Sequence, residues 1–388
     1  MKLSISDTSS RGLLIGLMVA HVLGTLFAYI VYIRLSSLGD GYQPGAFAAI
    51  KDVYAAKPGD ALSSTVLVWG IYFVLGAVLP GFIAPMALGL VVAILTWHAF
   101  RDVHMYIGRK LFWACNLFPH FLVWSGSSSK EQLVIICGII IINFAAKRSF
   151  AGSRLTINLI FVLFSLWFIF LTRPNYFIMY LIIFITALFS PWLHKIITKR
   201  LSVGMWVLPF ILSIIGVTFY LNQTGTFFSE DVVVFMLKVQ NSFLAYTAGS
   251  NRTDIQWNDM SDFIYHSLWG IPQGFIGPTL IEAISKPVQF PAFLEGLVYF
   301  SILCYLFINL VKLARISRTL KVHILPYIFI CFVIVFISYP FLMFNPGSAL
   351  RYKQAMHPIL IFYPLLILGY SRANHLMKAI VKKMPNEF

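Results

Sequence analysis

Charged residues are scarce in this chain, at 11% of 388 residues, whereas 59% are hydrophobic and 16% are aromatic. A soluble protein of this length cannot hide so much apolar surface in its interior. Apolar runs of roughly 20 residues match a bilayer core, since a helix rises about 1.5 Å per residue. The composition therefore excludes an ordinary soluble enzyme and predicts an all-α, polytopic transmembrane helix bundle.

Acidic residues are also few, with 14 Asp and Glu against 29 Lys and Arg, for a formal net charge of +15. In a soluble protein this excess would suggest nucleic acid. Here the cations fall mostly in short connections between apolar runs, which is the pattern of cytoplasmic loops. The basic connections at 147–154, 194–200 and 312–321 and the basic tail are therefore expected on the cytoplasmic side, with no nucleic-acid partner.

Several motifs are missing altogether. The four cysteines lack CxxC spacing, and the nine histidines are scattered without the spacing of metal ligands. The chain contains no P-loop, GxSxG, HExxH or dinucleotide fingerprint. The sequence therefore predicts neither a metal site nor a cofactor.

The apolar runs predict about 10–12 helices in a single membrane domain covering residues 1–388. They lie near 13–33, 62–79, 83–100, 111–125, 131–146, 155–171, 176–195, 205–221, 291–311, 324–343 and 355–371. Two polar segments are expected on the outer, periplasmic side. These are a first loop at 35–61 and a large loop at 222–290 that holds short amphipathic helices.

The orientation of the N-terminus is left open by the sequence. Eleven crossings counted back from a cytoplasmic tail place it outside, whereas Lys2 and Arg11 argue for the inside. A re-entrant or interfacial segment within 62–100, where Pro80 and Gly81 interrupt the apolar run, would resolve the conflict.

Ionisable groups at membrane depth are costly and usually functional, which makes the stretch "NPGSALRYKQAMHP" at 345–358 a candidate site. Asn-Pro-Gly is expected to end one helix, and Ser348 to cap the next. Arg351 and Lys353 then fall in its first turns, where cations oppose the helix dipole. A bound anion would reverse that argument, so this stretch predicts a diphosphate site with Tyr352 beside it.

Two other stretches offer cations on the same predicted side. In "FPHFLVWSGSSSKEQ" at 118–132, serines precede Lys130 and Glu131 at the start of an apolar helix. They serve either as a helix cap alone or also as a phosphate cradle. Arg173 lies in the tight turn "TRPN", where it either snorkels to lipid headgroups or faces a central cavity.

The large loop supplies acids, bases and aromatic rings in "NRTDIQWNDMSDFIYHSLWG" at 251–270. Arg252, Asp254, Trp257 and His266 suit sugar binding and proton transfer, because rings pack on pyranose faces and carboxylates accept hydroxyl hydrogen bonds. A solvated loop with interfacial tryptophans is the alternative. Asp40, after the first apolar run, is a second candidate acid.

Taken together, "GDGYQPGAFAAI", "FPHFLVWSGSSSKEQ", "RPNYF", the large late loop and "SALRYK" resemble the bacterial O-antigen (Wzy-like) polysaccharide polymerases, which are polytopic membrane glycosyltransferases. The resemblance implies inverting, metal-independent transfer of a glycan from undecaprenyl diphosphate to the next lipid-linked repeat unit. The reaction would take place at the outer face of the bacterial inner membrane. A flippase and a chain-length regulator of the same pathway are the implied partners.

On this interpretation the site residues take three roles. The candidate catalytic residues are Glu131, Asp254 and His266. The candidate diphosphate-binding residues are Arg351, Lys353, Arg173 and Lys130, and the candidate substrate-binding residues are Asp40, Arg252, Trp257 and Tyr352. An O-antigen ligase or another glycosyltransferase, and a transporter or flippase for lipid-linked oligosaccharide, are the alternatives.

Overall fold

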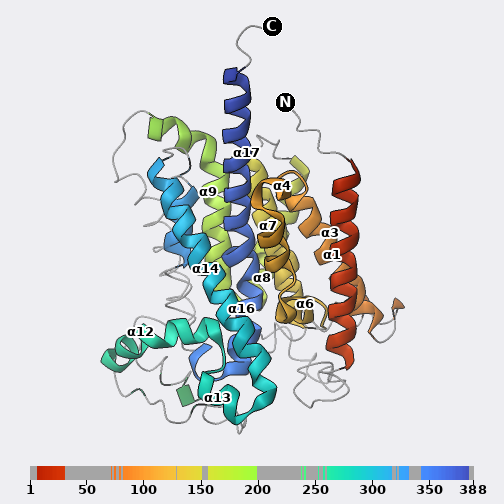
Figure 1. Ribbon diagram of the computed structural model, residues 1–388, viewed down its shortest axis with the longest axis vertical. Helices are drawn as coiled ribbons and strands as arrows, with labels where there is room; N and C mark the ends of the chain where they lie inside the picture. The colour runs from red at the N-terminus through yellow and green to blue at the C-terminus, as the bar shows by residue number, and fades with distance from the viewer. Residues whose placement is uncertain are drawn as a thin grey trace.

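The computed structural model describes residues 7–30, 82–127, 129–150, 156–198, 260–316, 323–331 and 342–383, together with isolated positions that include Arg252 and Trp257. Across these residues the chain is helical and contains no strand (Figure 1). The prediction of an all-α bundle is therefore confirmed.

The helices follow the apolar runs closely. They are α1 (Asp7–Ala28), α3 (Ile83–Phe100), α4 (His104–Ile107), α5 (Arg109–Asn116), α6 (Pro119–Ser125), α7 (Lys130–Phe150), α8 (Thr156–Thr172), α9 (Pro174–Thr198), α12 (Met260–Ile276), α13 (Leu280–Ser285), α14 (Phe290–Ile316), α16 (Pro346–His357) and α17 (Tyr363–Lys383). A 3-10 turn at 287–289 precedes α14, and a π-helical turn at 358–362 joins α16 to α17.

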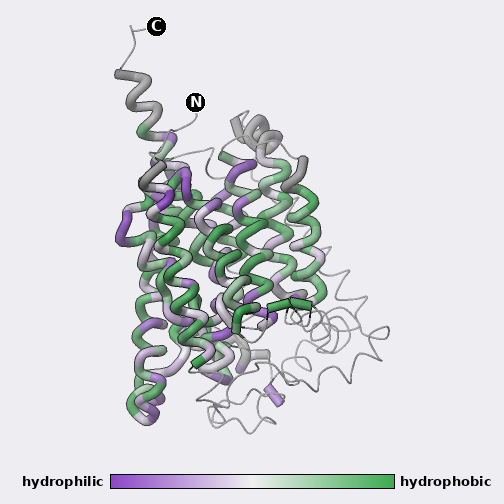
Figure 2. Tube along the Cα trace, turned by 90° about the vertical axis from the view of Figure 1, so that its right-hand side faces the viewer, coloured by the Kyte–Doolittle hydropathy of each residue, from purple (hydrophilic) through white to green (hydrophobic). Residues whose placement is uncertain are grey.

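Four of the described helices are long and apolar enough to cross a membrane. These stretches are Ser10–Ala28, Ile83–Phe100, Lys130–Phe150 and Pro287–Ile316. Figure 2 shows hydrophobic residues along most of the length of the bundle helices. Large apolar side chains on α8 and α14, such as Phe164 and Val298, point outward, as expected where the surrounding solvent is lipid. The chain is thus a helical membrane protein.

α7 lies inside the bundle, packed against α3, α8, α9 and α16. Its buried residues cover nearly all of its circumference, including Val134, Ile135, Ile139 and Ile142. A helix that is apolar on every side is stable only when other helices surround it. This arrangement places the polar start of α7 among the ends of its neighbours.

Side-chain hydrogen bonds tie several helix ends together at one end of the bundle. Trp97 Nε1 donates to the Ser10 carbonyl at 2.9 Å, and Lys147 Nζ donates to His98 Nε2 at 2.6 Å. Arg372 of α17 donates to backbone carbonyls of α4 at 3.1 Å. The start of α1 and the end of α17 therefore share this end (Figure 1), which agrees with the evidence of Lys2 and Arg11 that the N-terminus lies on the side of the tail.

The predicted run 111–125 is wrong as a single helix, because the chain breaks between α5 and α6. The break falls at Leu117 and Phe118, immediately before Pro119. Proline lacks an N–H to continue the helix, and it disfavours helical geometry in the residue before it. Phe118 accordingly has an extended ψ of 119°.

Helices α12 and α13 lie at the opposite end of the bundle, where α12 runs across the bundle direction (Figure 1). They are short helices within the predicted large loop. α12 meets α14 so closely that a Cβ on Gly296 would stand 1.8 Å from the Ile276 carbonyl oxygen. Gly277, which follows α12, has a φ of +93° that favours glycine. Gly277 thus permits the turn from α12 into α13, and Gly296 permits the close approach of α12 to α14. The 35–61 loop, the 62–79 segment apart from isolated positions, and most of 205–259 lie outside the described residues.

Candidate functional site

Three elements bring two arginines onto one carboxylate. Arg173, between α8 and α9, donates from Nη2 to Glu131 Oε1 at the start of α7. Arg351 Nε, from α16, lies 3.7 Å from the same oxygen atom. The sequence places these residues up to 220 positions apart, so only the packing of α7, α9 and α16 unites them.

Tyr352 lies against both guanidinium groups. The Arg173 Cζ atom stands 4.6 Å from the centre of the Tyr352 ring, and the Arg351 Cζ atom stands 5.0 Å from it. Arg351 Nη2 also donates to the Tyr352 hydroxyl at 3.3 Å. The electron-rich faces of aromatic rings attract cations, so this ring holds both arginines in place.

Lys130 adds a third cation to the arrangement, since it interacts electrostatically with Arg173, Glu131 and Tyr352. The preceding Ser129 hydroxyl accepts from the Gln132 backbone N–H at 3.3 Å. The predicted serine cap on this helix is therefore confirmed. It directs the first turn of α7, with Lys130 and Glu131, toward the two arginines. We call Lys130, Glu131, Arg173, Arg351 and Tyr352 the cation cluster.

The members of the cation cluster differ in their depth. The Glu131 side chain is 3% exposed, whereas the side chains of Arg173 and Arg351 are 13% and 20% exposed. Arg173 Nε is buried without a hydrogen-bond partner among the described residues. The carboxylate is thus the least exposed of the three charged groups. Such an arrangement can bind an anion with several hydrogen-bond acceptors, such as a phosphate.

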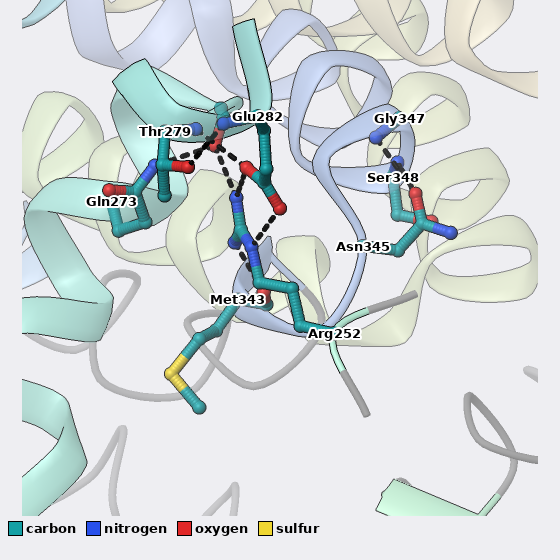
Figure 3. Close-up of polar contacts among 9 residues, drawn as sticks. Arg252, Gln273, Thr279, Glu282, Met343, Asn345, Gly347 and Ser348 are labelled. Carbon is teal, nitrogen blue, oxygen red and sulfur yellow. Dashed lines mark hydrogen bonds and ion pairs between the residues drawn. The ribbon is translucent and has the colours of Figure 1, made fainter. Parts of the chain in front are cut away.

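The start of α16 differs from the prediction. Asn345, not Ser348, is the cap, and its Oδ1 accepts from the Gly347 and Ser348 backbone N–H groups at 2.8 and 3.2 Å (Figure 3). Pro346 is the first helical residue, where proline is favoured because its missing N–H has no helical partner. Arg351 and Lys353 consequently fall in the second and third turns. The helix dipole acts mainly within the first turn, so it does not explain their placement.

Lys353 lies apart from the cation cluster. Its ammonium donates to the Phe275 carbonyl at 3.1 Å and stands 5.1 Å from the centre of the Tyr299 ring. The residue is fully buried, at 0% exposure. These contacts are with α12 and α14, whereas Arg351 faces α7 and α9. The structure therefore does not bring the predicted pair of cations together.

A second group of polar side chains, Glu295 and His120, lies on the Lys353 side of α16, and no motif in the sequence indicates it. Glu295 of α14 interacts electrostatically with Lys353, and it accepts from His120 Nδ1 at 2.6 Å. Both Glu295 oxygens also accept from the His120 backbone N–H at the start of α6. Glu295 thereby joins three helices inside the bundle.

Arg252 is an internal bridge in the structure (Figure 3). Its guanidinium donates to both oxygens of Glu282 at 2.8 and 2.7 Å, and to the Met343 and Gly277 carbonyls at 2.5 and 2.8 Å. The residue is 7% exposed. These contacts fasten the chain near 252 to α13 and to the segment before α16, and they occupy the donors that were predicted to bind substrate.

The remaining predicted residues are not gathered at the cation cluster. Trp257 is buried, with its ring 4.7 Å from that of Phe344. His266 lies on α12, where its ring contacts are with Tyr265 and Trp269 of the same helix. Asp40 and Asp254 lie outside the described residues.

The described residues contain no group of three or more His, Cys, Asp or Glu side chains that could hold a metal ion. The fold and the cluster define a helical membrane protein with a cation-rich polar site at the end of the bundle opposite the start of α1. Comparison with protein-family models, with curated proteins and with solved structures gives no match to this chain.

Proposed function

We propose that this chain is a membrane glycosyltransferase that polymerises lipid-linked oligosaccharide repeat units. The donor would be a glycan on undecaprenyl diphosphate, at the outer face of a bacterial inner membrane. The observation that carries the proposal is the convergence of Arg173, Arg351 and Lys130 at one end of the bundle. The resemblance of the sequence to surface polysaccharide polymerases adds the reaction class.

The chemistry explains why three cations are useful there. When the acceptor hydroxyl attacks the anomeric carbon, the bond to the diphosphate breaks and negative charge develops on the leaving group. Guanidinium and ammonium groups already in place stabilise that charge without reorganisation. The stacking of Arg173 and Arg351 on Tyr352 keeps both groups oriented before the substrate arrives.

The proton acceptor for the attacking hydroxyl is assigned among the predicted bases. Glu131 is engaged by Arg173 and Arg351 through one oxygen. His266 lies on α12, and Asp254 lies outside the described residues; we propose that one of these two predicted bases removes the proton.

Polymerisation by membranes that contain the protein, supplied with a lipid-linked repeat unit, tests this proposal. Arg351→Ala and Arg173→Ala should each lower the amount of long glycan per folded protein by about 10–150-fold, because each removes a charged contact worth about 1.5–3 kcal/mol. Arg372→Ala is a matched control, since Arg372 bonds α4 at the other end of the bundle. Full-length polymer from Arg351→Ala at the wild-type level would refute the proposed role.

Metal dependence provides a second test of the same function. The three cations take the place that a divalent ion often holds on a diphosphate, so polymerisation should proceed at an unchanged rate in EDTA. Loss of activity in EDTA that Mg²⁺ restores would contradict the metal-independent mechanism.

One observation favours a second candidate, which is transport of the lipid-linked oligosaccharide across the membrane. Lys353 and Glu295 are buried within the bundle, and ionisable side chains at such positions often line transport pathways. Reconstituted vesicles distinguish the two functions. A transporter moves the intact lipid-linked unit between leaflets, whereas a polymerase yields a ladder of longer glycans.

A further inference from the structure

We propose that Glu131 is a positioning residue that holds Arg173 and Arg351 as a matched pair of phosphate-binding groups. This role replaces the catalytic one predicted for Glu131 from the sequence. It rests on the proposed function for the identity of the natural ligand. The pairing itself can be tested without any glycan.

The first argument is geometric. A single oxygen, Glu131 Oε1, contacts Arg173 Nη2 and lies 3.7 Å from Arg351 Nε. This shared atom fixes the separation of two guanidiniums, one from the turn between α8 and α9 and the other from α16. The two guanidiniums both lie within about 5 Å of one tyrosine ring, so their positive charges repel each other. The negative charge of Glu131 offsets this repulsion.

The second argument concerns depth. Glu131 is 3% exposed, and both arginines are more exposed than the carboxylate they share. A proton acceptor must come within hydrogen-bond distance of the reacting hydroxyl. The nearly buried Glu131 carboxylate offers little surface for such an approach, and one of its oxygen atoms is already engaged by Arg173. Glu131 is therefore better placed to hold the arginines than to take the proton.

The third argument is the charge balance. Lys130, Arg173 and Arg351 carry three positive charges, and Glu131 cancels one of them, which leaves an excess of two. A diphosphate diester carries one negative charge on each phosphate, so the cluster with Glu131 neutralises it. Glu131 therefore sets both the spacing and the net charge of the anion site.

Binding of inorganic pyrophosphate and orthophosphate to the purified protein in detergent provides the test. The wild type should bind pyrophosphate at least about tenfold more tightly than orthophosphate, since each additional charged hydrogen bond contributes about 1.5–3 kcal/mol. Glu131→Ala should bring this ratio close to one, because the two arginines lose their common partner. A wild-type ratio near one, or a Glu131→Ala ratio equal to that of the wild type, would overturn the proposal.

Glu131→Gln keeps the test decisive if Glu131→Ala does not fold. The amide oxygen still accepts from Arg173 and keeps the spacing of the arginines, while the excess positive charge of the cluster rises from two to three. Because both features favour the more highly charged anion, this variant should keep the pyrophosphate preference and polymerise within about tenfold of the wild-type rate. Removal of a general base would instead lower kcat by about 10²–10⁴-fold with unchanged pyrophosphate affinity. That second result would return Glu131 to a catalytic role.

The two proposals fail in different ways. If the chain is not a polymerase, the wild type makes no glycan ladder, but the pyrophosphate ratios of the Glu131 variants still decide whether Glu131 positions the arginines. If only the positioning role is wrong, the wild type makes polymer and Glu131→Ala keeps the wild-type ratio.

Discussion

At the scale of single residues, the ion pair between Arg252 and Glu282 should contribute to stability in a way that depends on pH. Burial raises the pKa of Glu282, but hydrogen bonds from Arg252 and Thr279 lower it more, so its pKa lies below its ordinary value. A lowered pKa in the folded state means that the pair stabilises the fold fully above the unfolded carboxyl pKa of about 4.3. The stabilisation is then lost as the pH falls through the folded value.

This contribution predicts an acid-dependent difference between two proteins. The wild type should lose thermal stability more steeply than Glu282→Gln as the pH falls from 6 toward 3, because glutamine cannot titrate. Unfolding of both proteins in detergent, followed by tryptophan fluorescence, measures the difference. Equal acid slopes would show that the pair contributes nothing to stability.

Arg252→Ala should be more damaging than any change at Glu282. It would leave the Met343 carbonyl without its Arg252 donor and Glu282 without its cation, while the Gly277 carbonyl would keep only the hydrogen bond from Gln273 Nε2. Breaking a buried pair in this way costs on the order of 3 kcal/mol. The sequence could not show this role, because the partners of Arg252 lie 25–91 positions away.

Arg351 and Lys353 show what the sequence could have revealed about the site. Residues two apart on an α-helix point about 200° away from each other. Because "SALRYK" is predicted to be helical, this helical spacing already argues against the binding of one diphosphate by both Arg351 and Lys353. The approach of Arg351 to Glu131 could not be predicted from the sequence, because it depends on how α7 packs against α16.

At the scale of elements, the junction of α12 with α14 depends on the absence of a side chain. A Cβ at Gly296 would stand 1.8 Å from the Ile276 carbonyl oxygen, which belongs to backbone and cannot rotate away. Gly296→Ala should therefore push α12 from α14 and destabilise the fold by about 1–3 kcal/mol. Thermal unfolding in detergent measures the change.

Gly12→Ala is the matched control for that substitution. A Cβ at Gly12 has no atom within 4 Å, and alanine favours the helix over glycine by about 1 kcal/mol. This variant should be as stable as the wild type or more so. Equal stability of the Gly12 and Gly296 variants would contradict the close packing of the two helices.

The helices themselves were largely predictable, and the exceptions have local causes. Long apolar runs give α7, α8, α9 and α14 within a few residues of their predicted bounds. The break before α6 was missed because the apolar run continues through Leu117 and Phe118, although Pro119 marked it. Hydropathy thus locates a membrane helix well but does not show where the chain bends inside an apolar run.

At the scale of the whole molecule, composition was enough to predict a helical membrane bundle, because no other fold accommodates so much apolar surface. Composition was not enough to predict the orientation of the chain in the membrane, since the orientation depends on the number of crossings. The hydrogen bonds between Trp97 and Ser10 and between Arg372 and α4 place both described ends of the chain at one end of the bundle.

This arrangement predicts the outcome of topology mapping. Reporter domains fused before Asp7 and after Lys383 should be found on the same side of the membrane. A reporter inserted at Lys286, an exposed residue after α13, should be found on the opposite side. Activity of an enzyme reporter that works on one side only measures the difference, and opposite results for the two terminal fusions would refute the arrangement.

The position of α16 has a mechanical consequence. α16 lies between two groups of contacts. On one side Arg351 lies near Glu131 of α7, and on the other side Lys353 contacts Phe275 of α12 and Tyr299 of α14. Because both side chains belong to one rigid helix, a rotation of α16 that moved Arg351 would also move Lys353 relative to the Phe275 carbonyl. The contacts on the two sides of α16 are therefore mechanically linked through the helix backbone.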